Sequence, residues 1–420
     1  MSHSVRGYTN SRPQQPQRVV ITGLGVISSI GIGRDVFWDH LMSGYSGIGP
    51  ISSFDSSEFP VHQGAEVKQF DPTAYVLNLS PDSIGRASQF AIGAARLAVQ
   101  DANLHIPEDE AYDCGVAIGT TSGEPGIIER FDDQFVASHL DEVSSRFIAT
   151  YPCHVLAAHV ACELGLAGAV LTIPTACAAG NHAIARAYDE LRSGKAKVML
   201  AGGADAFSRI TYAGFARLGA IAPELCQPFD LNRKGMIPGE GAAFLVLETL
   251  EHALNRSAAV YSEVAGYGLS CDAYHMTAAD PQGSGGVRAM ECALAFAGLS
   301  PDDVDYISAH GTGTPTNDRL ETIAIKRVFG NRAARIPVSG IKSMLGHAMG
   351  AASAIEALAC VLAIRDGCIP PTINLYHSDP QCDLDYVPLT GRKHEVKVAL
   401  SNAYAFGGNN SSLLLARYEA

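Results

Sequence analysis

The sequence predicts an α/β fold in which sheets are covered by helices on both faces. Short apolar runs alternate with longer stretches of helical pattern along the chain, which is the arrangement that βαβ units produce. Hydrophobic residues form 47% of the 420 positions and charged residues only 17%, so a large buried core is expected. The 42 glycines suit the tight turns that connect such elements.

In the first half, alternating strands and helices lead to a cysteine at a strand-to-helix turn. The first strand begins at Arg18, where a β-branched run ends in glycine. The turn Thr175-Ala-Cys-Ala-Ala-Gly follows a strand and opens a helix that runs to Gly194, which places Cys177 at the start of that helix. The other expected elements of this half are helices at 36–43 and 88–102 and strands at 114–118, 170–174, 197–201 and 243–247.

The second half repeats this logic, because its strands lead into glycine-rich turns that carry polar residues. Strands are expected at 304–308, 336–339, 396–400 and 412–415. The first leads into Ala309-His-Gly-Thr-Gly-Thr and the second into Gly340-Ile-Lys-Ser-Met-Leu-Gly-His. A long apolar helix is expected over about 347–364. It carries Glu356 and many small residues, so we interpret it as a buried core helix rather than a membrane span.

The chain is expected to divide into a leader and two halves. Residues 1–17 are polar, lack the apolar core of a signal peptide and are interpreted as a disordered leader. The two halves are assigned to 18–255 and 256–420, with a linker near 248–257. No close sequence repeat is present, so the parallel between the halves lies in the order of their elements.

Charge and cysteine spacing limit the functional classes. A net charge of −13 argues against a nucleic-acid partner, whose phosphates require a basic surface, but an acidic partner could still dock on a local basic patch. The ten cysteines lie at irregular spacings without a Cys-x-x-Cys pair, which indicates neither a zinc site nor a disulfide framework. We therefore expect a cytoplasmic protein with reduced thiols.

Cys177 is the first candidate catalytic residue. Free backbone N–H groups gather at a helix N-terminus, where they favour a thiolate and can bind the oxyanion of a thioester under attack. An inert buried cysteine fits the same position equally well when the cysteine is considered alone.

His310 and His347 favour the catalytic interpretation. Each follows a short strand and is flanked by glycine, which lets a substrate approach the backbone. Two neutral histidines that donate Nε2–H bonds could hold a malonyl thioester while carbon dioxide leaves, and the resulting enolate needs no metal. Lys342 could supply positive charge to the site, although most lysines are simply solvated.

Four motifs together resemble the signatures of β-ketoacyl-ACP synthases. They are Thr175-Ala-Cys-Ala-Ala-Gly, Ala309-His-Gly-Thr-Gly-Thr-Pro, Lys342-Ser-Met-Leu-Gly-His and Phe406-Gly-Gly-Asn-Asn, in the order and approximate spacing of that family. Further matches are Pro228-Phe-Asp, Gly239-Glu-Gly and Asp272-Ala-Tyr-His-Met-Thr, so the resemblance covers about residues 18–418. It implies a thiolase-like fold, in which two pseudo-duplicated βαβαβ halves form a five-layer αβαβα sandwich, and a dimer.

The resemblance also implies the roles of the reacting groups. Cys177 would take an acyl chain from acyl carrier protein, and the N–H groups of Cys177 and Phe406 would form the oxyanion hole. His310 and His347 would promote malonyl decarboxylation and stabilise the enolate that attacks the acyl group. A histidine at 347 is similar to the elongating Cys-His-His enzymes and unlike the initiating Cys-His-Asn enzymes.

Other residues match supporting positions of the family. Lys342 and Glu356 match the charged residues behind the site, and Asp318 matches the acidic residue after the first histidine. Phe406 matches the gating aromatic residue of a mobile loop. The positions implied to bind substrate on its phosphopantetheine arm are Thr312, Thr314, Gly407 and Gly408. No cofactor is implied beyond that arm.

Four departures from the family pattern favour a ketosynthase of secondary metabolism, of type II polyketide or polyene type, over a housekeeping fatty-acid enzyme. Ala405 stands where glycine is usual, Asn409 replaces a threonine and Lys234 replaces an aspartate. In the segment 71–95, where relatives often dock the carrier protein, Arg86 is the single basic residue. A polyketide enzyme of this kind would pair with itself or with a chain-length-factor paralogue.

Three other functions remain open at this point. A non-catalytic chain-length factor typically lacks the nucleophile, whereas Cys177 is present. A CoA-dependent thiolase needs a second cysteine near its C-terminus, and Cys382 lies outside any glycine-rich motif. A Cys-His thioester hydrolase would need an ordered water at the position assigned to malonate.

Overall fold

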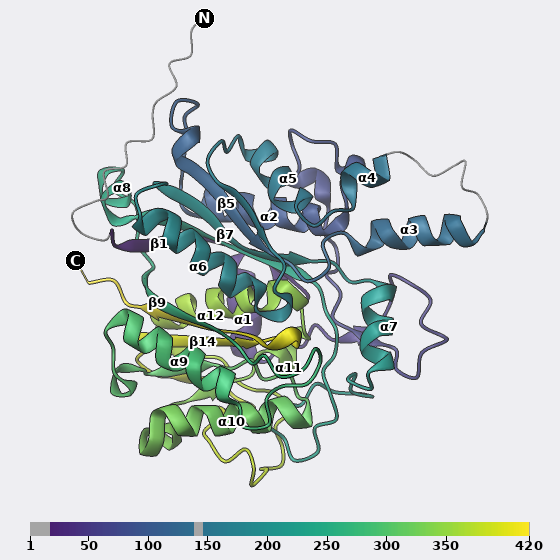
Figure 1. Ribbon diagram of the computed structural model, residues 1–420, viewed down its shortest axis with the longest axis vertical. Coiled ribbons are helices and arrows are strands. Elements are labelled where there is room, and N and C mark those ends of the chain that lie inside the picture. Colours follow the sequence, from purple (N-terminus) through teal and green to yellow (C-terminus); the bar gives the residue numbers. More distant parts are fainter. Residues whose placement is uncertain (1–16, 138–145, 420) are drawn as a thin grey trace, which may run out of the picture.

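The computed structural model describes residues 17–137 and 146–419. The predicted leader lies outside the described residues except for residue 17. Figure 1 shows a molecule in which sheets and helices alternate in layers.

Each half of the chain contributes five strands with the same pattern of pairing. In the first half the strands run in the order β6-β5-β7-β8-β1, and in the second half β11-β10-β14-β15-β9. In both, the first two pairings are parallel and the last two antiparallel. The strands are β1 Val19–Ser28, β5 Cys114–Gly119, β6 Val170–Ile173, β7 Val198–Asp205, β8 Gly241–Thr249, β9 Ser262–Cys271, β10 Tyr306–Ser308, β11 Val338–Ser339, β14 Val398–Tyr404 and β15 Asn409–Ala416.

The two sheets are joined at one edge and separated elsewhere by a layer of helices. Val20 and Ile21 of β1 pair with Glu263 and Ser262 of β9. Helices α6 (Ala179–Arg192) and α12 (Ala352–Asp366) pack against each other and against both sheets. Every residue of α12 from Ala352 to Ile364 is buried. A helix that is buried on every side needs apolar residues all around it and not along one stripe.

The outer layers complete the five-layer αβαβα sandwich that the resemblance implies. Helices α2 (Arg86–Asp101) and α5 (Val155–Leu164) cover the outer face of the first sheet. Helix α9 (Ser284–Ala297) lies on β9 and β15, with α10 (Pro315–Phe329) beside it (Figure 1).

Smaller elements connect these layers. The remaining helices are α1 Arg34–Ser43, α3 Pro125–Val136, α4 Arg146–Thr150, α7 Arg209–Arg217, α8 Leu250–Asn255 and α11 Lys342–Leu345. The short strands are β2 Gly31–Ile32, β3 Gly49–Pro50, β4 Gln63–Gly64, β12 Cys368–Ile369 and β13 Arg392–Lys393. The 3₁₀ turns are η1 Pro72–Ala74, η2 Pro81–Ser83, η3 Ala111–Asp113, η5 Ala176–Ala178, η6 Pro301–Asp303, η7 Gly330–Arg335, η8 Met349–Ala351 and η9 Phe406–Gly408.

Two sequence expectations differ from the observed elements. The apolar helix expected to begin near 347 begins at Ala352, because Met349 has a φ of +50° and opens the 3₁₀ turn η8 instead. The segment 248–257, expected to be a linker, contains the end of β8 and helix α8, and Glu248 is completely buried there. No helix of the described residues is long and apolar enough to cross a membrane.

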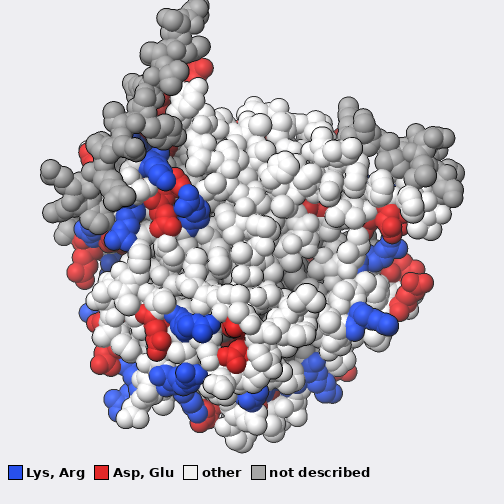
Figure 2. Space-filling model, viewed as in Figure 1, with Lys and Arg blue, Asp and Glu red and all other residues white. Residues whose placement is uncertain are grey.

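Charge is unevenly distributed over the surface. Figure 2 shows that the middle of the viewed face is almost free of Lys, Arg, Asp and Glu, which gather around its margin. Exposed apolar side chains occur on α3 and α4 and on the edge strand β6, including Val136, Ile148 and Val170. These features are typical of a surface that contacts another protein.

Candidate active site

A cavity of about 290 Å³ brings together Cys177, His310 and His347, the three residues that the sequence singles out. The two halves of the chain both contribute to its lining. Thr312, Thr314 and Phe406 also line it, as the resemblance implies.

Cys177 lies in the 3₁₀ turn η5, between strand β6 and helix α6, where the sequence places it. The preceding residue, Ala176, has a φ of +50°, a left-handed conformation that costs energy for a residue with a β-carbon. The turn directs the thiol into the cavity, and the residue is only 7% exposed.

Burial of Cys177 acts against the thiolate that the helix N-terminus favours. Burial raises the pKa of the Cys177 thiol to about 12, and Lys342, which acts in the opposite direction, does not compensate. The physical reason is that a buried thiolate loses its hydration. The thiol therefore stays protonated at neutral pH.

His310 is fixed by hydrogen bonds to both its backbone and its ring. Its backbone N–H and that of Gly311 each donate to the Glu321 carboxylate at 2.9 Å. The Nδ1 atom lies 3.3 Å from Nζ of Lys342. Since an ammonium group can only donate, Nδ1 is the acceptor and Nε2 carries the hydrogen.

His347 has the same tautomer for a different reason. Its Nδ1 accepts a hydrogen bond from the backbone N–H of Met349 at 3.2 Å, which leaves the hydrogen on Nε2. The rings of His310 and His347 are 5.5 Å apart between centroids and nearly perpendicular. Burial lowers the pKa of both histidines well below the ordinary value, and Lys342 lowers it further. The site therefore presents two neutral N–H donors.

Lys342 and Glu356 form a buried ion pair behind the histidines. Lys342 Nζ donates to Glu356 and, at 2.6 Å, to the carbonyl oxygen of His310. Both side chains of the pair are 2% exposed. Burial raises the pKa of Glu356 to about 7, although Lys342 lowers it. Lys342 is thus a fixed part of the site and not a solvated lysine.

Asp318 organises the loop that carries the two threonines. It is completely buried at the start of α10 and accepts hydrogen bonds from the backbone N–H groups of Phe229 at 2.8 Å and Gly313 at 3.2 Å. The hydroxyls of Thr312 and Thr314 are 2.9 Å apart. Asp318 therefore supports the cavity wall from behind. It is not one of the described residues that line the cavity.

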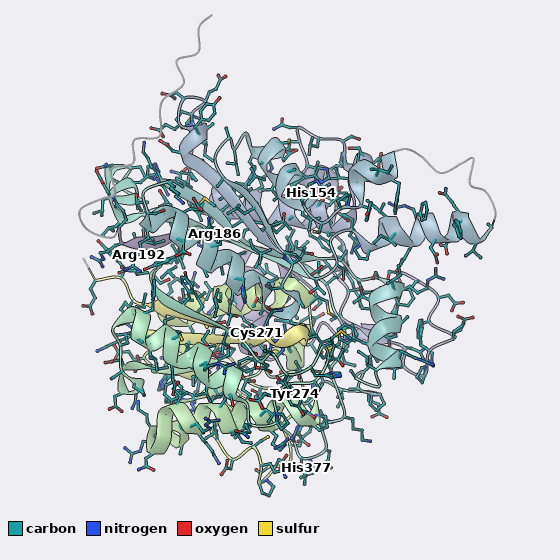
Figure 3. The ribbon with its side chains drawn as sticks, viewed as in Figure 1. His154, Arg186, Arg192, Cys271, Tyr274 and His377 are labelled. Carbon is teal, nitrogen blue, oxygen red and sulfur yellow. The ribbon has the colours of Figure 1, made fainter. Side chains whose placement is uncertain are left out.

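The glycines of the implied gating loop fasten that loop to the segment after β9. Gly407 donates its N–H to the carbonyl of Met276 at 2.7 Å, and the carbonyl of Gly408 accepts from Asp272 N–H at 2.9 Å. The thiol of Cys271, which ends β9 and is labelled in Figure 3, lies 3.6 Å from the Gly407 carbonyl. In the described structure Gly407 and Gly408 do not line the cavity, whereas Phe406 does.

Phe406 closes one side of the cavity. Its ring stacks on that of Phe215 in α7 at 5.9 Å between centroids, and the side chain is 41% exposed. Ala405 has φ −135° and ψ 156°, an extended conformation that alanine adopts without strain. The alanine thus fits the closed position of the loop.

Sequence reasoning missed several buried groups around the site. Glu321 holds the His310 backbone, Tyr404 packs against the His310 ring at 5.8 Å between centroids, and Asp205 holds the turn after His347. Glu321 could have been found, because it falls three residues after Asp318 on the buried face of α10. Asp205 and Tyr404 are the last residues of β7 and β14. No spacing in the sequence distinguishes them from other residues at strand ends.

Comparison with known families identifies the family of the chain. The model of the β-ketoacyl synthase N-terminal domain matches residues 16–253, and that of the C-terminal domain matches residues 261–376. The chain belongs to the β-ketoacyl synthase family. This synthase is an acyltransferase, and its activity is the ketosynthase reaction that forms β-ketoacyl products.

Relatives of known name cover nearly the whole synthase. The 3-oxoacyl-[acyl-carrier-protein] synthase 2 of Synechocystis sp. is 44% identical and covers 96% of this chain and 99% of that protein. Nodulation protein E of Rhizobium leguminosarum bv. trifolii is also 44% identical, over 94% of this chain and 98% of its own. Both are therefore similar to this synthase in length as well as in sequence.

Solved structures confirm the thiolase-like fold. The ishigamide ketosynthase/chain length factor has a TM-score of 0.92 and 44% identity, covering 96% of this chain and 100% of that one. A type II polyketide ketosynthase, solved with its acyl-carrier protein and bound to the hexaketide, has a TM-score of 0.89 and 36% identity over 96% of this chain and 100% of its own.

Proposed function

We propose that the synthase is an elongating enzyme of the Cys-His-His type that condenses an acyl group on Cys177 with malonyl-ACP to give β-ketoacyl-ACP. The observation that carries the proposal is the meeting of one protonated thiol with two Nε2–H donors in a single cavity. A thiol nucleophile can accept an acyl group covalently, and a pair of neutral N–H donors can stabilise the oxygen of an enolate.

In the first step Cys177 takes the acyl group from the carrier. The bond between sulfur and the acyl carbon forms as the carrier thioester breaks, and the proton of the Cys177 thiol ends on the carrier thiol. The oxyanion of this step would accept from the N–H groups of Cys177 and Phe406. The raised pKa of the thiol indicates that its proton leaves during the attack and not before it.

In the second step malonyl thioester loses its carboxylate as carbon dioxide. The electron pair of that bond becomes the enolate, whose oxygen would accept from Nε2–H of His310 and of His347. The enolate carbon then attacks the acyl carbon on Cys177, a carbon–carbon bond forms, and the sulfur of Cys177 leaves and regains a proton.

The surrounding residues would have supporting roles. Lys342 and Glu356 hold the tautomer of His310, and Asp318 holds the loop with Thr312 and Thr314, whose hydroxyls would bind the phosphopantetheine arm. The arm would pass Phe406, which would swing aside as a gate together with Gly407 and Gly408. No resident cofactor is assigned, because neutral N–H donors are sufficient for an enolate, and we assign the enzyme to the cytoplasm.

Two partners follow from this function. Acyl carrier protein would deliver both substrates, as in the solved complex of a related ketosynthase with its carrier. A second ketosynthase-fold chain, either a copy or a chain-length-factor paralogue, would cover the edge strand β6. The exposed apolar residues there and the uncharged area of Figure 2, between the positions labelled His154 and Cys271 in Figure 3, support such an interface.

The pathway that we favour is type II polyketide or polyene synthesis. Ala405, Asn409 and Lys234 depart from the common pattern of the synthases to which the sequence is similar. The related solved structures include polyketide ketosynthases, whereas the curated relatives include 3-oxoacyl-ACP synthases. Fatty-acid elongation is the alternative that the same chemistry would serve.

Intact mass spectrometry after incubation with acyl-ACP and then malonyl-ACP tests the proposal. We expect an acyl adduct on Cys177 and then a β-ketoacyl-ACP two carbons longer, and neither product with Cys177→Ala. Condensation by Cys177→Ala at the wild-type rate would refute the role of the thiol. Adding a chain-length-factor paralogue separates a missing subunit from a non-catalytic chain, and release of free acid would identify a hydrolase.

A further inference from the structure

Asp205 is a buried acid next to the site to which the mechanism above gives no role. It is the last residue of β7 and is completely buried. Its Oδ1 accepts from the hydroxyl of Thr120 at 2.7 Å and from the N–H of Ser122 at 3.0 Å. Its Oδ2 accepts from the N–H groups of Thr121 at 2.7 Å and Gly350 at 2.6 Å.

These four donors come from opposite halves of the chain. The three residues from Thr120 to Ser122 form the turn after β5 in the first half, and Gly350 lies in η8 of the second half. A β-carbon at Gly350 would lie 2.7 Å from Oδ2 of Asp205 and 2.6 Å from the carbonyl carbon of Thr120. Glycine is therefore needed for this close approach. The carboxylate thus pins η8 against the turn after β5.

The pinned turn is the one that fixes His347. Gly350 follows Met349, whose N–H donates to Nδ1 of His347 and leaves the hydrogen on Nε2. Met349 has a φ of +50°, and such a conformation persists only where neighbouring contacts hold it. The hydrogen bond from Gly350 to Asp205 is a contact of this kind, one residue along the chain.

We propose that Asp205 is a positioning residue that holds η8 so that His347 presents Nε2–H to the enolate. The inference rests on the role proposed for His347. It assigns the tautomer and placement of one enolate donor to a buried carboxylate that the mechanism does not otherwise use.

Asp205→Asn tests the proposal, because the amide keeps the shape, loses the charge and turns an –NH₂ group toward backbone N–H donors. We expect decarboxylation of malonyl-ACP to fall by roughly ten- to a hundredfold, the effect of a misplaced reacting group. We also expect the rate of alkylation of Cys177 by iodoacetamide, located by peptide mass spectrometry, to stay near the wild-type value, because Cys177 lies on η5 and not on η8. A purely structural residue would lower both rates together. Wild-type decarboxylation, or an equal fall in both rates, would overturn the proposal.

Two further variants serve as controls. Asp205→Glu keeps the charge but not the reach, so decarboxylation should fall while alkylation of Cys177 stays at the wild-type rate; unchanged decarboxylation would overturn the proposal even if Asp205→Asn does not fold. Glu124→Gln removes another buried carboxylate, which accepts from Ser88 on α2. An equal fall in decarboxylation there would show a general effect of losing a buried carboxylate and refute the assignment.

This experiment is independent of the test of the proposed function. Cys177→Ala leaves Asp205 in place and asks whether the thiol is the nucleophile. The Asp205 variants keep the thiol and ask what orients His347, so failure of one test does not imply failure of the other.

Discussion

Lys342 determines the protonation of the reacting groups more than any other single residue. It bonds to Nδ1 and the carbonyl of His310, pairs with Glu356, and lowers the pKa values of Cys177 and both histidines. A fixed ammonium group at this position favours neutral imidazoles. Its effect on the thiol is smaller than that of burial, so the reaction begins from a thiol.

His347→Ala removes one of the two donors to the enolate. We expect malonyl decarboxylation to fall on the order of a hundredfold, as for other oxyanion-type donors, while acyl transfer to Cys177 continues. Carbon dioxide release from labelled malonyl-ACP measures the first rate and adduct formation the second. His377→Ala, at an exposed histidine labelled in Figure 3, is the control. Unchanged carbon dioxide release in His347→Ala would contradict the role.

The histidines also predict the acid side of the pH profile. Because their pKa values lie well below 6.5, both rings remain neutral as the pH falls through the ordinary range of histidine titration. We therefore expect the rate of decarboxylation by the acylated enzyme to show no fall with a midpoint near pH 6.5. A pH profile with a clear fall of that midpoint would show that a histidine of ordinary pKa controls the step.

At the scale of elements, the junction between the halves is held by a buried carboxylate. Glu248 at the end of β8 accepts from Arg256 at 2.6 Å and from His252 at 2.5 Å, both beside or in α8. Burial alone would raise the pKa of Glu248, but the bonds from Arg256, His252 and Thr22 lower it to about 2. The sequence analysis expected a linker at this position, and the ion pair explains why the segment is ordered instead.

Glu248→Gln should lower the free energy of unfolding by about 3 kcal/mol at pH 7, since one partner of a buried pair is removed. A carboxyl group with a lowered pKa stabilises the fold above its unfolded pKa, near 4.3, and loses that effect as the pH falls toward about 2. Thermal midpoints of variant and wild type should therefore converge below about pH 4. A gap that stays constant to pH 3 would contradict the assignment.

Sequence patterns predicted most of the fold and only part of the site. Apolar runs located strands such as β5 and β7, because these strands are buried on both faces. The motif residues Cys177, His310 and His347 were found because glycines mark their turns. Asp205 could not be found, because its role depends on the approach of Gly350, 145 residues away. The burial that raises the pKa of Cys177 could not be predicted either, because burial depends on how the whole chain packs.

At the scale of the whole molecule, the two halves support each other's turns. Strand β7 of the first half packs against η8 of the second, and β14 of the second half packs against η5, which carries Cys177. The strands end at Asp205 and Tyr404, in equivalent places of the two sheets. Helices α6 and α12 are shared by both sheets. The cavity therefore exists only when both halves are present.

This exchange of support makes the synthase a candidate for fragment complementation. A chain cut between residues 255 and 256 should yield two pieces that are each inactive and aggregation-prone, because each exposes one side of the central helical layer. Co-expressed, they should copurify and recover acylation of Cys177, since every strand pairing except that of β1 with β9 lies within one piece. An active first piece on its own would show that the nucleophile needs no support from the second.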